Sequence, residues 1–309
     1  MKQDAGGDDD QSTPKKRVKK NYNVETDRWN IGATNSGQYE VEEGLFLQIF
    51  DMNTLEEKVS LLEETRIYIQ AQFRLKEPEQ VITDLVPFWS AGPRLLSAWF
   101  NWITGQKEFL HLAESAESNM AKVTNLVADF LVSKKGDAFE REIEESRNNS
   151  QNKTGNSILF SIFLFRALGK FWKNKPEKLI FLAGTDQAKD IQEHLPFIHV
   201  SVRNMMGTDT HEEEVVLGVR IGDKVVYDEI SFTEAIAATI ELYFVMNLLY
   251  PPECDDLCQF LQRIVLIFGA PEGARNKRNQ TKKAFKDFDS FVADFYYKSK
   301  KADLVKVYK

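Results

Sequence analysis

Acidic and histidine side chains gather around residue 210, and they are the residues of this chain best suited to chemistry. Asp209, His211 and Glu212 fall within four positions, and His199 lies in an apolar run just before them. Oxygen and nitrogen ligands at this density can bind a metal ion or move a proton. A solvated loop that leads into a strand has the same composition. We therefore keep these four residues as weak ligand candidates and predict no metal site from them.

Cys254 and Cys258 are four positions apart, which places two thiols on one face of a helix. A structural zinc site needs four ligands, and no histidine or further cysteine lies near this pair in the sequence. We interpret both as thiols of the core or the surface, and we predict no cofactor. No stretch matches the motifs of serine hydrolases, zinc proteases or P-loop enzymes. The sequence therefore names no catalytic residue and favours a protein that is not an enzyme.

Gln262 and Arg263 interrupt the apolar helical run from Leu257 to Phe268. A polar pair inside a buried helix needs partners, because an unsatisfied buried charge is costly. We favour a structural ion pair of Arg263 with Glu234 or Glu241. A recognition site is the alternative.

Basic clusters lie near both ends of an acidic chain. Residues 1–20 carry a net charge of +2 and residues 270–309 a net charge of +6. Because the whole chain has a net charge of −7, residues 21–269 carry −7 − 8 = −15. Such an acidic body argues against a general nucleic-acid binder, because phosphate contacts dominate that affinity. The first cluster resembles a nuclear import signal, with nucleic-acid contact and a merely solvated tail as the other interpretations. Its cations are Lys15, Lys16, Arg17, Lys19 and Lys20.

The second basic cluster surrounds an apolar stripe at helical spacing. The stripe consists of Phe285, Phe288, Val292 and Phe295, and the lysines beside it are Lys282, Lys283, Lys286 and Lys298. A final helix docked on the acidic body is the simplest interpretation. A basic amphipathic helix can also bind a partner groove, a membrane surface or nucleic acid.

The elements that would position these residues are mostly helical. Thr54 to Glu57 matches a capping box, apolar spacing predicts a helix that follows Gly105 and carries its apolar face from Phe109 to Phe130, with Gly136 as its stop, and Gly222-Asp223 between two β-branched runs predicts a hairpin. We predict an α+β fold with a helical first half, and with a second half in which buried helices pack on a short antiparallel sheet. Five regions follow: a disordered tail (1–38), a helical region (39–145), a linker (146–156), an α+β domain (157–270) and a basic C-terminal segment (271–309).

The helix from Ala235 to Tyr250, its Pro251 stop and the later run Phe260 to Arg263 carry a family resemblance. This region resembles the C-terminal part of animal proteins of unassigned activity that are labelled sterile alpha motif domain-containing protein 3-like. The resemblance implies a shared fold and spread by mobile elements, and it supplies no catalytic residue. The sterile alpha motif domain itself has no counterpart here.

These observations favour a non-enzymatic interaction or regulatory protein of the nucleus or cytoplasm. Neither a signal peptide nor a run of about 20 apolar residues is visible. We expect a protein partner, with nucleic acid as a second partner through the basic ends. Two other classes stay open: an enzyme or enzyme remnant of mobile-element origin that acts on nucleic acid, and a capsid-like assembly protein.

Overall fold

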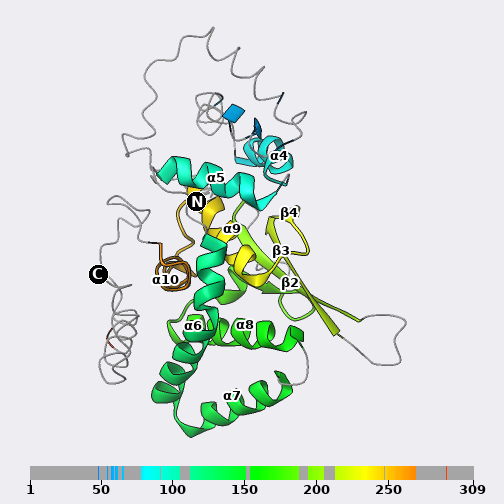
Figure 1. Ribbon diagram of the computed structural model, residues 1–309. Helices are drawn as coiled ribbons and strands as arrows, with labels where there is room; N and C mark the ends of the chain where they lie inside the picture. Colours follow the sequence, from blue (N-terminus) through cyan, green and yellow to red (C-terminus); the bar gives the residue numbers. More distant parts are fainter. Residues whose placement is uncertain are drawn as a thin grey trace, which may run out of the picture.

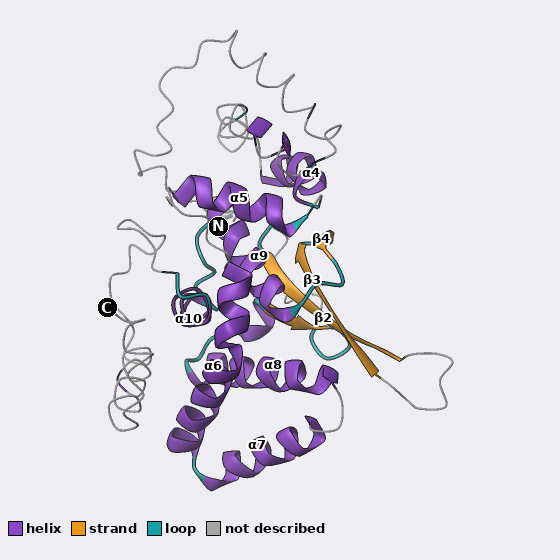
Figure 2. Ribbon diagram, viewed as in Figure 1, coloured by secondary structure: helices purple, strands orange, loops and turns teal. Residues whose placement is uncertain are grey.

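Helices pack against a small sheet whose longest strands project away from them (Figure 1). The computed structural model describes residues 78–90, 92–104, 112–150, 154–187, 194–204, 213–246 and 248–268, with a few single positions such as Thr54 and Glu57. Helix clearly exceeds strand in this part of the chain (Figure 2). The prediction of a predominantly helical α+β fold is confirmed.

The elements follow one another in nearly the expected order. The described α-helices are α4 (Pro78–Trp89), α5 (Pro93–Thr104), α6 (Leu112–Lys135), α7 (Asp137–Ser150), α8 (Thr154–Phe171), α9 (Phe232–Val245) and α10 (Asp255–Phe260). The strands are β1 (Ile180–Leu182), β2 (Pro196–Asn204), β3 (Glu213–Ile221) and β4 (Lys224–Tyr227). A 3-10 turn, Pro176–Lys178, precedes β1, and a π-helical turn, Leu261–Val265, continues α10.

Local signals in the first half act as predicted. The Glu57 N–H donates to Thr54 Oγ1 and the Thr54 N–H donates to Glu57 Oε2, both over 3.2 Å, which completes the capping box. Helix α6 buries the predicted apolar stripe, including Val123, Val127 and Phe130. It ends at Gly136, and α7 begins at the next residue.

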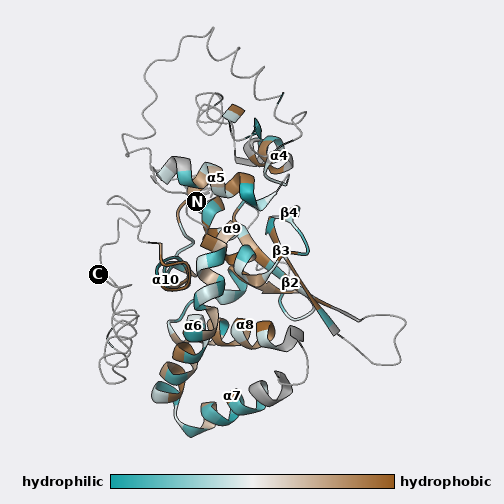
Figure 3. Cartoon of the chain, in the orientation of Figure 1, coloured by the Kyte–Doolittle hydropathy of each residue, from teal (hydrophilic) through white to brown (hydrophobic). Residues whose placement is uncertain are grey.

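The predicted linker 146–156 is largely helical, which corrects the sequence interpretation. Helix α7 continues to Ser150, and α8 begins at Thr154. Helix α7 is mostly hydrophilic (Figure 3), and among its described side chains Phe139 and Ile143 attach it to the core. The Phe139 ring stacks on Phe163 of α8 with 6.1 Å between centroids. Phe139 and Ile143 are four positions apart, and two apolar residues are too few to establish a helical period in the sequence.

The sheet has the order β1-β2-β3-β4 and is mixed, whereas the sequence predicted an antiparallel sheet. Strands β2, β3 and β4 form the expected antiparallel meander, and Gly222 has a φ of +61° in the predicted turn. Strand β1 runs parallel to β2, with Ile180 opposite Ile198. Direction cannot be read from a three-residue apolar strand, because it depends on the connection that follows.

One face of the sheet packs on helices α8 and α9. Ile180, Ile198, Val200, Val219 and Ile221 lie on this face, and each is at most 1% exposed. Helix α9 begins with a capping box between Ser231 and Glu234, and nearly all of its side chains are buried. It contacts α5, α6, β2 and β3, so it is the central helix of the described fold. None of the described helices is long and apolar enough to cross a membrane.

Candidate functional site

His199 lies on the sheet face opposite α8 and α9, because its neighbours Ile198 and Val200 point into the core. The side chain is half-buried, and the Phe181 ring stacks on the imidazole with 5.9 Å between centroids. Burial lowers the pKa of His199, and the positive charge of Arg220 lowers it further, while Asp228 opposes the shift. The imidazole is therefore neutral at pH 7 and able to accept a proton or a hydrogen bond.

Gly218 explains how Asp228 comes near this histidine. Gly218 is paired with His199 across the sheet, and the chain leaving β4 passes directly over it. A Cβ atom on Gly218 would lie 2.6 Å from the Tyr227 carbonyl oxygen and 3.1 Å from Asp228 Oδ1. The missing side chain thus makes room for an acidic residue on the sheet face. We call His199, Phe181, Arg220 and Asp228 the His199 cluster.

The His199 cluster has the chemistry of a polar binding site. It combines a neutral imidazole, a guanidinium, a carboxylate and an aromatic face, but the described residues include no hydrogen bond from His199 to Arg220 or Asp228. A nucleophile and its base need such a contact, although it can form only when substrate binds. The other weak ligand candidates, Asp209, His211 and Glu212, lie outside the described residues.

The two cysteines lie in the core. Cys254 and Cys258 are free and fully buried, with their Sγ atoms 3.9 Å apart. Burial raises the pKa of the Cys258 thiol well above its ordinary value, so it stays protonated and unreactive. Within the described ranges, no three His, Cys, Asp or Glu residues converge in a way that could hold a metal ion.

Arg263 is exposed, so it is not the buried charge in need of a partner that the sequence suggested. Its neighbour Gln262, the other polar residue of this helical run, is the one buried in the core. Its side chain accepts a hydrogen bond from the Tyr250 hydroxyl (2.8 Å) and donates one to the Phe268 carbonyl (3.3 Å). The π-helical turn shifts the register of this segment, which a regular helical period cannot anticipate.

Glu241 has a different partner from the one expected. It is 1% exposed on α9, and Ser97 of α5 donates to its carboxyl oxygens over 2.9 and 3.0 Å. Burial raises the pKa of Glu241 to about 8, against the hydrogen bond from Ser97, which lowers it. Glu234 instead completes the capping box of α9.

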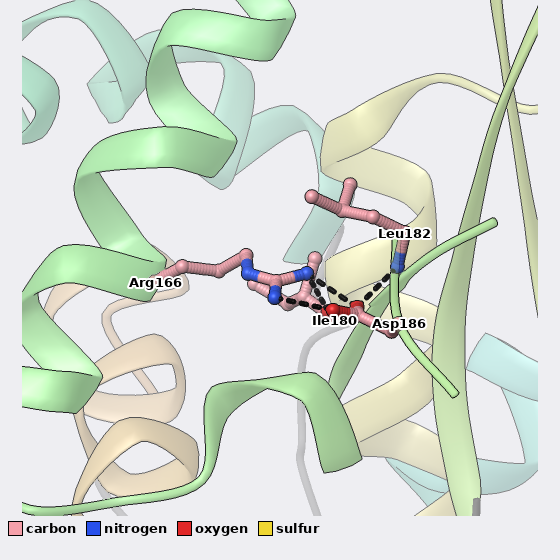
Figure 4. Close-up of polar contacts among 4 residues, drawn as sticks. All are labelled: Arg166, Ile180, Leu182 and Asp186. Carbon is pink, nitrogen blue, oxygen red and sulfur yellow. Dashed lines mark hydrogen bonds and ion pairs between the residues drawn. The ribbon is translucent and has the colours of Figure 1, made fainter. Parts of the chain in front are cut away.

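An ion pair that the sequence did not indicate joins α8 to the sheet (Figure 4). Arg166 donates to both carboxylate oxygens of Asp186 over 2.6 and 2.8 Å, and it also donates to the Ile180 carbonyl over 3.0 Å. Asp186 in turn accepts from the Leu182 N–H over 2.7 Å. The signal that could have revealed Arg166 is its position as a single cation in the apolar run of α8.

The import cluster Lys15, Lys16, Arg17, Lys19 and Lys20 lies outside the described residues, as does the apolar stripe from Phe285 to Phe295. Comparison of the chain with protein-family models, with curated proteins and with solved structures gave no match.

Proposed function

We propose that this chain is a non-enzymatic interaction or regulatory protein that binds a protein partner through the free ends of β2 and β3. These ends, residues 201–204 and 213–216, form a two-stranded ribbon that projects away from the helices (Figure 1). We call them the β2–β3 ribbon. Its projection from the helices, with Val202 and Glu214 exposed on it, is the observation that carries the proposal.

The β2–β3 ribbon extends past both neighbouring strands. Strand β1 pairs with β2 only as far as Val200, and β4 pairs with β3 only from Val219 onward. Residues 201–204 and 213–216 therefore have no further strand beside them in the described sheet. Val202 in this ribbon is 49% exposed.

An extended partner segment can add to such an edge through main-chain hydrogen bonds, with side chains such as Val202 providing specificity. Proteins normally protect unpaired strand edges, because these edges pair with other chains. Here the edge of β1 is closed by Arg166 and Asp186, and β4 packs against α4, where Lys224 Nζ donates to Thr83 Oγ1. Protection of the outer strands supports a specific role for the ribbon.

Affinity purification of the full-length chain from cells tests the proposal when wild type is compared with two variants. Val202→Asp places a charge on the ribbon, and Val225→Asp places the same charge on β4, where the valine is 43% exposed. We expect partners to be lost with Val202→Asp and kept with Val225→Asp, with equal melting temperatures for both. Equal partner sets from the two variants would reject the ribbon as the binding element.

The nuclear part of the proposal rests on the five cations between Lys15 and Lys20. A cluster of this kind binds an acidic receptor groove through its charge alone. The acidic body from residue 21 to residue 269 makes the two basic ends distinct from the rest of the chain.

An enzyme that acts on nucleic acid is the second candidate, and the His199 cluster is the observation that favours it. A neutral imidazole between Arg220 and Asp228 can act as a general base near a phosphate. Incubation of the purified chain with single- and double-stranded DNA and RNA would test this. Cleavage that disappears in His199→Ala, and persists in His194→Ala, would establish the enzyme and displace the proposal above.

A further inference from the structure

The carboxyl group of Glu241 lies in the contact between α5 and α9, where Ser97 is its hydrogen-bonding partner among the described residues. Both of its oxygens lie within 3.0 Å of the Ser97 hydroxyl, and the residue is 1% exposed. The hydroxyl has one proton, so it can satisfy only one oxygen of a charged carboxylate at a time. A charged Glu241 would leave the other oxygen unsatisfied in an apolar contact, which is costly.

Within the described ranges, no cation is among the groups that set the pKa of this carboxyl group. Helix α5 presents Ser97 to it, and β4 presents Tyr227, whose own pKa is raised by burial and by the nearby Glu241. Burial and the hydrogen bond from Ser97 are the causes that set the pKa of Glu241, and no described charged group of α6, β2, β3 or the π-helical turn, which also pack on α9, contributes to it. The raised pKa, about 8, is the expected consequence of this geometry.

Helix α5 closes this contact from one side, and α4 packs on α5 and on β4. Helix α5 buries Leu96 and Phe100 completely, and the Phe100 ring packs on Phe244 of α9 and on Phe268, with centroids 5.4 and 5.0 Å away. The start of α5 is also attached to β4, because the Tyr227 hydroxyl donates to the Gly92 carbonyl over 3.5 Å. Separation of α5 from α9 would thus expose both the carboxyl group and an aromatic surface.

We propose that α4 and α5 form a pH-sensitive cap on α9, which is seated while Glu241 is protonated and released as Glu241 becomes charged. In the seated state the protonated carboxyl group of Glu241 has an O–H group of its own that can donate a hydrogen bond in the contact with Ser97. In the released state water solvates the carboxylate, and the aromatic surface of Phe244 and Phe268 becomes available to a partner.

The direction of the pH effect follows from linkage. The pKa of Glu241 is about 8 in the seated state and near the ordinary 4.5 when the group is solvated. The preference for the seated state is therefore complete below about pH 4.5 and is lost as the pH rises to about 8. Over this interval the released fraction grows about tenfold per pH unit, and above it the fraction is constant.

Hydrogen exchange of the full-length chain between pH 5 and pH 9 tests the cap, with rates corrected for the intrinsic pH dependence of exchange. In the wild type, protection of α5 should fall about tenfold per pH unit up to about pH 8 and then level off. Peptides from the paired parts of β2 and β3 serve as the internal reference. Glu241→Gln keeps the shape and removes the charge, so its α5 protection should not depend on pH.

Glu144→Gln makes the same chemical change at an exposed position on α7 and should behave as wild type. Ser97→Ala provides a second test, which remains decisive should Glu241→Gln not fold. Ser97 lowers the pKa of Glu241, so without it the fall in protection should continue beyond pH 8. The cap is rejected if α5 protection is independent of pH in the wild type, if Glu241→Gln keeps the wild-type slope, or if Ser97→Ala levels off at the same pH as wild type.

Discussion

Arg166 and Asp186 bind each other and, through the same groups, the outer edge of strand β1. The inner edge of β1 is defined by its bonds to β2, since the Ile198 N–H donates to Leu179 and the Ala183 N–H donates to Val200. Alternate residues of a strand turn their backbone groups to opposite sides, so Ile180 and Leu182 face outward. Arg166 bonds the outward carbonyl of Ile180, and Asp186 bonds the outward N–H of Leu182. The ion pair takes the place of a fifth strand.

Removal of the guanidinium should therefore cost more than an ordinary ion pair. Both side chains are at most 10% exposed, and loss of one partner leaves a buried charge behind. We expect Arg166→Met to lower the free energy of unfolding by about 3–5 kcal/mol. Urea unfolding followed by circular dichroism measures this change.

Lys178→Met is the matched control, because it breaks the pair of Lys178 with Glu253, whose side chains are 16% and 37% exposed. Its expected cost is below about 1 kcal/mol. Comparable losses of unfolding free energy from the two variants would show that the position of Arg166 at the sheet edge adds no stability beyond that of an ordinary ion pair.

The pKa of Asp186 is lowered, above all by the hydrogen bond from Arg166 against the opposing effect of burial. Its contribution is thus present above about pH 3.8 and is lost as the pH falls below that value.

Gly218→Ala tests the close approach of the chain over the sheet. The new methyl group would lie 2.6 Å from the backbone oxygen of Tyr227, which cannot move without disturbing β4. We expect the free energy of unfolding, measured by thermal melting, to fall by about 1–3 kcal/mol. Gly169→Ala in α8 is the control, because its closest neighbours are side-chain atoms of Pro176 and Leu257 at 3.2 and 3.3 Å. Its loss should be clearly smaller, since these contacts of 3.2 and 3.3 Å are less severe than the 2.6 Å contact at Gly218, and alanine favours a helix.

The hairpin turn gives a second backbone prediction. Gly222 has a φ of +61°, where a β-branched side chain is strained. Gly222→Val should lower the free energy of unfolding by about 1–3 kcal/mol, whereas Gly222→Asn should cost much less, because asparagine tolerates this conformation. An unchanged melting temperature for the valine variant would contradict the turn assignment.

The His199 cluster predicts opposite effects of its two charged members on one titration. The pKa of His199 lies below 6.5, with burial as the largest cause and the charge of Arg220 as the second. Arg220→Gln should raise this pKa, and Asp228→Asn should lower it further. Imidazole chemical shifts measured by NMR across pH 4–8 provide the test, with His199→Gln to assign the resonance. Parallel shifts in the two variants would show that neither charge lies near the ring.

The import cluster predicts a change of location without a change of stability. Alanine at Lys15, Lys16, Arg17, Lys19 and Lys20 should move the chain from nucleus to cytoplasm and leave its melting temperature unaltered, because the cluster acts through its charge. The 35.6 kDa chain needs a large fluorescent tag, since it is small enough to diffuse through nuclear pores. A variant that stays in the nucleus would show either that the C-terminal cations Arg275, Lys277 and Arg278 carry import or that the assignment to the nucleus is wrong.

The sequence by itself determined the elements whose signals are local. The Thr54 capping box, the buried stripe and glycine end of α6, the Gly222 turn and the apolar α9 can all be read from spacing, because each depends on residues within a few positions. It did not reveal α7, whose attachment rests on Phe139 and Ile143, or the direction of β1.

Only the tertiary structure decided which polar residues meet. Arg166 and Asp186 are 20 residues apart, and Ser97 and Glu241 are 144 apart. Nothing in the period of a helix or strand relates such positions. Arg166 and Glu241 are each a charged residue within an apolar run, so the sequence indicates that each needs a partner. The identity of that partner depends on how α8 meets β1 and how α5 crosses α9, because a buried polar group bonds whatever the packing of whole elements places beside it.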